Sequence, residues 1–192
     1  HGGAGKYDLS SSEAQKSGEF LNGIHRLVKL DDSVKRTAPE GVQQYLKIVE
    51  KVRGNFGKGA YPGSPWFALE GMRETDKATI FEMQRDVFQQ LRHNIHDKRA
   101  GLHERDAYEG LLGVIPPKEK RGLVMIDPPY ELERKDFPQL VELLVAAYKK
   151  WPTGVFAVWY PIKDRAMIER FEKKMFKTGI RRQLVCEVCV WP

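Results

Sequence analysis

The sequence predicts an α/β protein with a mostly parallel β-sheet. From residue 76 onward, short apolar or β-branched runs alternate with stretches in which apolar residues recur every three or four positions. Such alternation is typical of βαβ units, in which a helix connects two parallel strands. The run Leu123-Val124-Met125-Ile126 contains no polar residue, which is typical of a parallel strand that is buried on both faces.

The first part of the chain is predicted to be mainly helical. Apolar residues recur at helical spacing in part of 12–31 and throughout 39–53, and glycines at 54, 57 and 59 mark the end of the second stretch. Residues 61–65, Tyr-Pro-Gly-Ser-Pro, are typical of a turn, and a short helix is expected to follow through Gly71. We therefore expect residues 10–75 to form a helical insertion in a single domain that spans residues 1–192.

The remainder of the chain supplies the alternating elements of the sheet. Pro116 and Pro117 end one of its helices. Another helix shows the periodicity clearly, since Val87, Phe88 and Leu91 share one face. Runs rich in apolar and β-branched residues predict strands over 78–82, 100–103, 122–126, 154–160 and 182–191. Helical spacing predicts helices over 84–95, 106–114, 136–151 and 164–178.

The composition is that of a globular protein. Of the 192 residues, 41% are hydrophobic and 30% are charged, which is enough for one domain with a substantial core. No apolar run approaches the roughly 18 residues of a membrane span, so we expect no membrane partner. Two cysteines argue against a disulfide scaffold and favour a cytoplasmic location. The net charge of +6 and the pI of about 9.2 favour a polyanionic partner, and we expect a monomer.

The segment Asp127-Pro128-Pro129-Tyr130, which follows the apolar run, suits one chemical task. The exocyclic amino nitrogen of adenine or cytosine is a poor nucleophile, because its lone pair is delocalised into the ring. Asp127 and the Pro128 carbonyl would accept hydrogen bonds from this amino group, and the two prolines fix the backbone between them. Tyr130 would offer a ring on which the base stacks. The alternative is a Pro-rich turn at the end of a strand, with Tyr130 as ordinary packing.

Three other places carry residues that suit ligand binding at the carboxyl edge of a parallel sheet. His1-Gly2-Gly3-Ala4-Gly5 would let the backbone approach a ligand closely, and a flexible terminus is the alternative. Glu82 ends a predicted strand and would accept from two ribose hydroxyls, unless it is a solvated strand end. Asp106 would accept from an adenine amino group, cap the helix that follows, or do both.

No metal site is expected from the sequence. Cys186 and Cys189 lie three apart in a predicted strand, so they would point to opposite faces, and we expect core or structural roles for them. His93 and His96, with His103 nearby, lack a matching pattern of carboxylates or cysteines. We therefore expect these histidines to belong to a solvated helix end.

Several motifs follow one another along the chain in an order that is specific. The motifs are the glycine loop at 1–5, Tyr-Pro-Gly-Ser-Pro at 61–65, Glu82, Arg-Asp-Ala-Tyr at 105–108, and Arg-Gly-Leu-Val-Met-Ile-Asp-Pro-Pro-Tyr at 121–130. Together they resemble the bacterial 23S ribosomal RNA adenine-N6 methyltransferases of the RlmJ type, some of which are described as proteins for catabolism of external DNA. Asp-Pro-Pro-Tyr alone is shared by many amino-methyltransferases, whereas the first two motifs are more particular to this family.

The resemblance implies a Rossmann-like class I fold that uses S-adenosylmethionine, with the helical insertion after the first strand. It implies methyl transfer to adenine N6 in 23S ribosomal RNA, with Asp127 as the catalytic acceptor and Pro128, Pro129 and Tyr130 against the base. Because the family has segments before the glycine loop and after residue 192, we expect a domain truncated at both ends. The residues expected to contact the cofactor are His1, Gly3, Gly5, Ser64, Glu82, Asp106, Ala107 and Asp127.

Two other functions fit the same residues. A DNA adenine-N6 methyltransferase would use identical chemistry, since only the channel for the nucleic acid differs. A nucleic-acid-binding protein linked to the use of external DNA would have kept the fold and lost catalysis. The intact motif at 127–130 argues against that loss.

Overall fold

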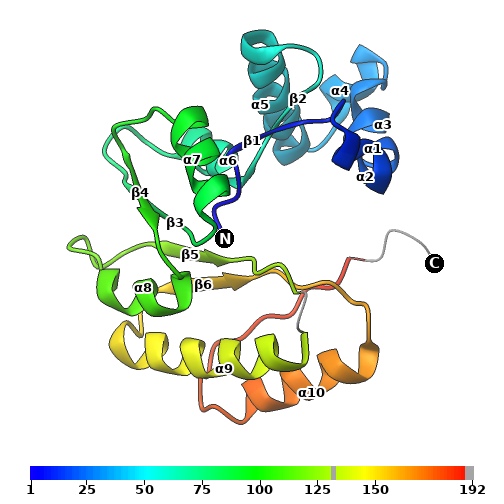
Figure 1. Cartoon of the computed structure of the whole chain (residues 1–192). Helices are drawn as coiled ribbons and strands as arrows, with labels where there is room; N and C mark the ends of the chain where they lie inside the picture. Colours follow the sequence, from blue (N-terminus) through cyan, green and yellow to red (C-terminus); the bar gives the residue numbers. More distant parts are fainter. Residues whose placement is uncertain (131–132, 189–192) are drawn as a thin grey trace. The chain divides into compact units, whose positions relative to one another are not determined.

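The computed structural model describes residues 1–130 and 133–188, which fall into two compact units (Figure 1). The N-terminal unit is Gly2–Asp106, and the C-terminal unit is His1 together with the chain from Ala107 onward. Each unit combines helices with short strands, which confirms the expected mixed α/β class. Within the described residues, no helix is both long and apolar enough to cross a membrane.

Two strands that are far apart in the sequence pair in the N-terminal unit. β1 (Lys6–Asp8) runs antiparallel to β2 (Ala60–Pro62), with Tyr7 opposite Tyr61. The chain between them is helical, and Val49 and Val52 of its longest helix are fully buried. Its helices are α1 (Ser12–Ser17), α2 (Glu19–Asn22), α3 (Ile24–Val28), α4 (Asp32–Thr37) and α5 (Glu40–Phe56).

The rest of the N-terminal unit is a βαβ arrangement. β3 (Ala78–Glu82) and β4 (Ala100–Glu104) are parallel and are joined by α7 (Arg85–Asn94). A further helix, α6 (Ser64–Gly71), precedes β3. Buried side chains of α6 and α7 share one core, which is why this pair of strands can hold its shape.

The C-terminal unit has a second parallel pair of strands. The elements in order are α8 (Ala107–Val114), β5 (Leu123–Ile126), α9 (Glu133–Lys150), β6 (Val155–Val158) and α10 (Arg165–Phe176). β5 and β6 are paired so that Ile126 lies opposite Val158, and helices cover one face of the pair (Figure 1). Leu140 of α9 and Ile168 of α10 are almost completely buried in this core.

Most of the expected elements are confirmed within a few residues, and the differences have physical causes. β1 and β2 were not predicted, because three residues are too few to show a periodic pattern. The strand expected over 182–191 is wrong for 182–188, which have no regular secondary structure, and Leu184 is 93% exposed. The last three residues of that range, 189–191, lie outside the described residues.

The expectation that β5 is buried on both faces is also wrong. Leu123 is 64% exposed and Met125 is 55% exposed, whereas Val124 and Ile126 pack in the core. In the described structure the helices of this unit cover only one face of the β5–β6 pair, so alternate side chains are buried. The single domain over 1–192 and the insertion at 10–75 remain predictions.

Candidate functional site

Asp127 lies at the carboxyl end of β5, on the sheet face that the helices of its unit leave uncovered. Its neighbours Ile126 and Pro128 are both buried, whereas Asp127 is half-buried, as expected when consecutive side chains of an extended chain point to opposite sides. Burial raises the pKa of the Asp127 carboxyl above its ordinary value. The carboxylate is therefore partly stripped of water, which strengthens any hydrogen bond that it accepts.

Tyr130 does not offer the open ring that the sequence suggested. Its side chain is only 2% exposed, its ring centroid lies 5.4 Å from that of Phe137, and its hydroxyl donates to the Trp159 carbonyl oxygen over 2.6 Å. A buried tyrosine normally finds a partner for its hydroxyl in this way. The expectation of a stacking face at Tyr130 is thus corrected, and the packing alternative holds for this side chain.

The backbone of this motif is held in an unusual conformation. Tyr130 has a φ of +52°, in the left-handed region that non-glycine residues seldom adopt. The His1 backbone nitrogen donates to the Asp127 carbonyl oxygen over 3.4 Å, so His1 lies beside the Asp-Pro-Pro-Tyr segment of its own unit. Pro129 is exposed, and the contacts of Pro128 and Pro129 with a base remain predictions.

The glycine loop is fixed in the N-terminal unit by four hydrogen bonds. Its backbone N–H groups donate to Phe81 and Glu82, Asn94 Nδ2 donates to the Ala4 carbonyl over 2.8 Å, and the Gly63 N–H donates to the Gly5 carbonyl. These bonds link the loop to β3, to α7 and to the turn before α6. The alternative of a flexible terminus is therefore wrong for residues 2–5.

Two positions in this region require glycine. Gly3 has a φ of +64°, and a Cβ there would collide with the Tyr7 hydroxyl. A Cβ on Gly63 would lie 2.9 Å from the Gly5 carbonyl oxygen, which is too close for a carbon atom. The glycine loop and the Tyr-Pro-Gly-Ser-Pro segment thus meet backbone to backbone.

Glu82 is a buried carboxylate with both oxygens engaged. It is 3% exposed, its Oε2 accepts from the Gly3 N–H over 3.0 Å, and its Oε1 accepts from the Gln84 N–H over 2.9 Å. The burial excludes the alternative of a solvated strand end. Glu82 therefore ties the glycine loop to the carboxyl end of β3, and its contact with a ribose remains a prediction.

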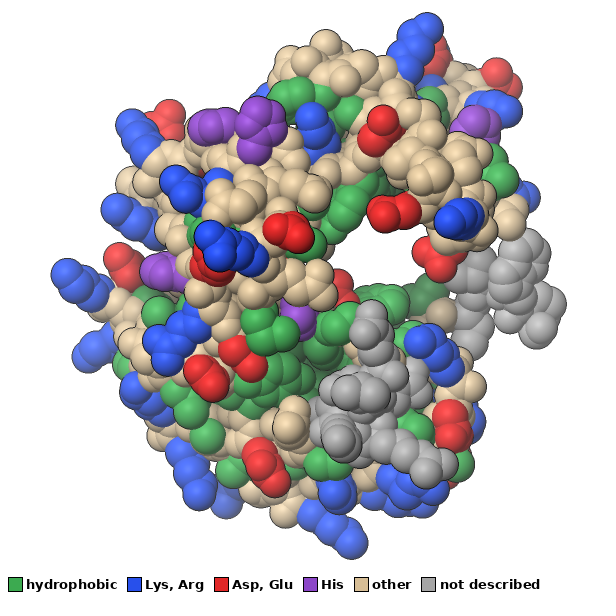
Figure 2. Space-filling view, in the orientation of Figure 1, with side chains coloured by type: hydrophobic (Ala, Val, Ile, Leu, Met, Phe, Trp, Pro, Cys, Tyr) green, Lys and Arg blue, Asp and Glu red, His purple; other side chains and the backbone are tan. Residues whose placement is uncertain are grey.

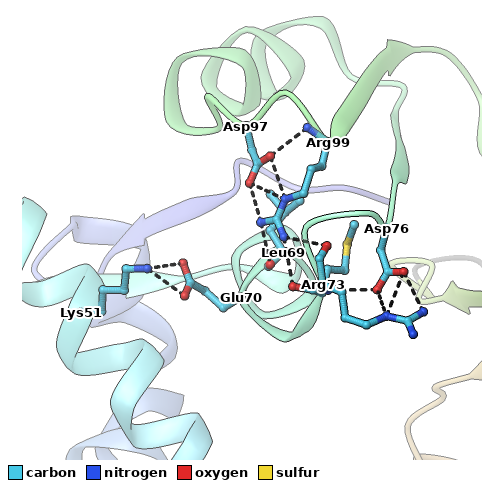
Figure 3. Close-up of polar contacts among 8 residues, drawn as sticks. Lys51, Leu69, Glu70, Arg73, Asp76, Asp97 and Arg99 are labelled. Carbon is cyan, nitrogen blue, oxygen red and sulfur yellow. Dashed lines mark hydrogen bonds and ion pairs between the residues drawn. The ribbon is translucent and has the colours of Figure 1, made fainter.

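The helix that begins at Ser64 is anchored at its other end by an arginine (Figure 3). Arg99 donates to the carbonyl oxygens of Leu69 and Met72 over 2.9 and 3.1 Å, at the end of α6, where helix carbonyl groups lack partners in the next turn. Asp97 orients the guanidinium, and the hydrogen bonds from Arg99 lower the pKa of Asp97 to about 2. Ser64 itself is exposed at the first residue of the helix.

Neither Arg99 nor Asn94 was predicted from the sequence. Their partners are backbone carbonyl oxygens, which any residue provides, so no side-chain pattern marks the pairs. The only local signal was Asp97 two residues before Arg99, a spacing that lets a carboxylate hold a guanidinium at the start of a strand.

Asp106 and Ala107 stand at the junction of the two units. Asp106 is the last residue of the N-terminal unit and directly precedes α8, which is the position of a helix N-cap. Ala107 is the first residue of α8. Both are half-buried, and their contacts with a cofactor remain predictions.

Metal-binding side chains do not gather in the described part of the chain: no group of three or more His, Cys, Asp or Glu residues there could hold an ion. Cys186 is exposed, which contradicts the core role expected for it. Cys189 lies outside the described residues.

The surface charge is mixed. Figure 2 shows lysine and arginine side chains spread over the face that it presents and interspersed with aspartate and glutamate. That distribution agrees with a net charge of only +6 over 192 residues.

Comparisons with known proteins agree on one family. The profile of the family described as "Ribosomal RNA large subunit methyltransferase D, RlmJ" matches residues 1–192. Ribosomal RNA large subunit methyltransferase J of Haemophilus influenzae is 38% identical over 196 residues, and the protein of the same name from Escherichia coli is 35% identical over 193 residues. Each match covers 100% of this chain and 67% of the relative.

A solved structure extends the likeness to three dimensions. The crystal structure of a protein from Legionella pneumophila superimposes with a TM-score of 0.81 at 29% identity, over 93% of this chain. The match covers 64% of that protein, so this chain spans less than two thirds of its length.

Proposed function

Because the chain belongs to the RlmJ family of ribosomal RNA large subunit methyltransferases, we propose that it methylates N6 of an adenine in 23S ribosomal RNA. The family assignment covers every residue, and two curated relatives bear the name of this enzyme. The proposal that an amino nitrogen accepts the methyl group rests on the sequence of this chain, in which a carboxylate is followed by two prolines at the end of a strand. A cytoplasmic location and a monomeric state remain predictions.

We propose a Rossmann-like class I fold, in which residues 10–75 are an insertion in one domain. Two observations support it: β3 and β4 are parallel around α7, and β5 and β6 are parallel around α9. Strand–helix–strand units of this kind build doubly wound sheets. Ligands of such sheets bind beyond the carboxyl ends of the strands, where Glu82 and Asp127 are found.

The described residues fit S-adenosylmethionine, which when bound supplies the methyl group. The loop at Gly2–Gly5 has no side chain larger than a methyl group and is held in a fixed conformation, so a ligand can approach its backbone closely. Glu82 is held rigidly beside this loop, where a carboxylate suits a ribose. The residues that would hold the cofactor are His1, Gly3, Gly5, Ser64, Glu82, Asp106, Ala107 and Asp127.

Asp127 is the proposed catalytic residue. Its half-buried carboxylate lies at the end of β5, where it can accept a hydrogen bond from an adenine amino group. The Pro128 carbonyl is the proposed second acceptor. Two acceptors that hold both N–H bonds direct the nitrogen lone pair toward the methyl group, so the contribution of the protein is orientation and electrostatic stabilisation.

A methyl-transfer assay tests the proposal and separates it from its alternatives. The purified protein is incubated with radiolabelled S-adenosylmethionine and, in separate reactions, with naked 23S ribosomal RNA, assembled large subunits and DNA. Label in the ribosomal RNA is expected, and label confined to DNA would identify a DNA methyltransferase. If calorimetry detected no binding of S-adenosylmethionine and no substrate became labelled, a non-catalytic nucleic-acid-binding protein would be the better account.

A further inference from the structure

Trp159 is fixed beside the catalytic motif by both of its backbone polar groups. It directly follows β6, and its N–H donates to the carbonyl oxygen of Ile126 over 3.0 Å. Its own carbonyl accepts the Tyr130 hydroxyl over 2.6 Å. All of these residues belong to the C-terminal unit, so their geometry is that of one compact body.

The Trp159 side chain shares a sheet face with Asp127. Val158 and Tyr160, on either side of it, both pack against the core, so the indole points to the opposite face. Asp127 points to the same face, since its neighbours Ile126 and Pro128 are buried. Ile126 is opposite Val158 in the ladder, so the next residues of the two strands are neighbours, and adjacent strands lie about 4.8 Å apart.

The indole is available to a ligand. Trp159 is 54% exposed, although tryptophan is mostly buried in folded proteins. The aromatic ring of the motif itself, that of Tyr130, is buried in the core and cannot stack with a ligand. Asp127 at the end of β5 thus supplies an acceptor for an amino group, and Trp159 at the end of the neighbouring β6 supplies an exposed aromatic face.

We propose that Trp159 is the aromatic platform on which the target adenine stacks while Asp127 holds its amino group. The inference rests on the proposed function and assigns to Trp159 the stacking contact with the base at that site. A planar base on an indole face gains a stacking contact that is largely independent of sequence. The base enters after leaving its own helix stack, and Trp159 replaces the stacking that it has lost.

This assignment gives Tyr130 a positioning role. Its hydroxyl holds the Trp159 carbonyl, and its ring packs against Phe137, so the motif that contains the acceptor also sets the position of the platform. The alternative role for Trp159 is packing. Leu123, Met125 and Val155 of the same two strands also expose apolar side chains, and Trp159 would pack beside them.

Three variants of the purified protein test the assignment. Trp159→Leu keeps an apolar side chain but removes the aromatic face, whereas Trp159→Phe keeps a smaller face. Phe176→Leu is the matched control, since Phe176 is a 66% exposed ring at the end of α10 in the same unit. For each protein, kcat and KM for 23S ribosomal RNA are measured, together with the Kd for S-adenosylmethionine by calorimetry.

We expect Trp159→Leu to lower kcat/KM for RNA at least about tenfold, the size of a typical base–aromatic stacking contact. Its Kd for S-adenosylmethionine should stay within about twofold of wild type, Trp159→Phe should keep most of the activity, and Phe176→Leu should keep all of it. A further readout is tryptophan emission, which RNA should quench in the wild type and more weakly in Trp159→Phe.

The opposite results overturn the assignment. If Trp159→Leu were as active as wild type, the base would not stack there. If Trp159→Phe were as impaired as Trp159→Leu and both bound S-adenosylmethionine poorly, Trp159 would be a packing residue. A wild-type protein that methylated no nucleic acid would instead refute the proposed function, and the assignment with it.

Discussion

The Tyr130 hydroxyl donates a hydrogen bond to the Trp159 carbonyl oxygen over 2.6 Å, and this bond joins the Asp-Pro-Pro-Tyr segment to the end of the neighbouring strand. The bond explains why a tyrosine closes the Asp-Pro-Pro-Tyr sequence in this chain. A ring alone would fill the same space in the core, but only a hydroxyl reaches the carbonyl.

Tyr130→Phe should therefore lower the free energy of unfolding by about 1–2 kcal/mol, because a part-buried carbonyl loses its donor. It should also lower kcat for RNA methylation, since the position of Trp159 is less well fixed. Urea denaturation and steady-state kinetics measure the two effects. Tyr148→Phe is the control, because Tyr148 makes no hydrogen bond through its hydroxyl to the described residues. Equal stability of Tyr130→Phe and wild type would contradict this role.

Glu82→Gln should weaken both the fold and cofactor binding. An amide can accept with only one of its two end groups, so one of the N–H groups of Gly3 and Gln84 would face another donor. We expect a loss of about 1–3 kcal/mol in the free energy of unfolding and at least about tenfold weaker binding of S-adenosylmethionine.

The matched control for this change is Glu104→Gln. Glu104 is opposite Glu82 in the β3–β4 ladder, ends its strand in the same way, and is exposed. Calorimetry and urea denaturation should show little change in that protein. A similar effect from both substitutions would mean that general charge at this sheet edge matters, and not the bond to the glycine loop.

Asn94→Asp should detach the glycine loop from α7. The substitution replaces the amide that donates to the Ala4 carbonyl with a carboxylate that cannot donate and repels that oxygen. Loss of one such bond corresponds to roughly fivefold weaker cofactor binding, about 1 kcal/mol. The defect should shrink at acidic pH, where a protonated carboxyl regains a donor. Gln90→Glu adds the same charge one turn earlier on α7, at an exposed position, and should leave the affinity unchanged.

Asp127 should make the fold less stable as the pH rises. Burial raises the pKa of its carboxyl, so the folded state holds the proton more tightly than the unfolded state, whose pKa is about 3.9. The free energy of unfolding therefore falls as the pH rises from about 3.9 through the raised value and is constant above it. Asp127→Asn removes this dependence.

Urea denaturation of both proteins between about pH 4 and pH 8 measures the difference. At neutral pH, Asp127→Asn should be at least as stable as wild type, and the gap should close as the pH approaches 4. A wild-type protein that gained stability over Asp127→Asn as the pH rose would show that its site favours the charged carboxylate.

The sequence predicted the strands and helices that have several periodic residues, and it placed Glu82 and Asp127 at strand ends. It could not show β1 and β2, whose three-residue pairing depends on contacts across more than 50 residues. It also misjudged Tyr130 and Met125. Whether an aromatic or apolar side chain is buried depends on which face the helices cover, and a local motif carries no information about that face.

The same limit applied to the parts of the site that are built from backbone. The Gly5–Gly63 contact and the Asn94–Ala4 hydrogen bond join segments that are 58 and 90 residues apart, through carbonyl groups that every residue has. Family motifs mark the glycines, but only the fold shows which bonds hold them.

Nucleoside analysis of 23S ribosomal RNA after incubation with S-adenosylmethionine tests the central claim most directly, with wild type and Asp127→Ala compared. We predict N6-methyladenosine with the wild type and a loss of at least about 10²-fold with Asp127→Ala, the size of effect seen when a preorganised catalytic contact is removed. The variant should still unfold cooperatively in urea. Formation of N6-methyladenosine at the wild-type rate by Asp127→Ala, or of a different methylated nucleoside by the wild type, would contradict the account.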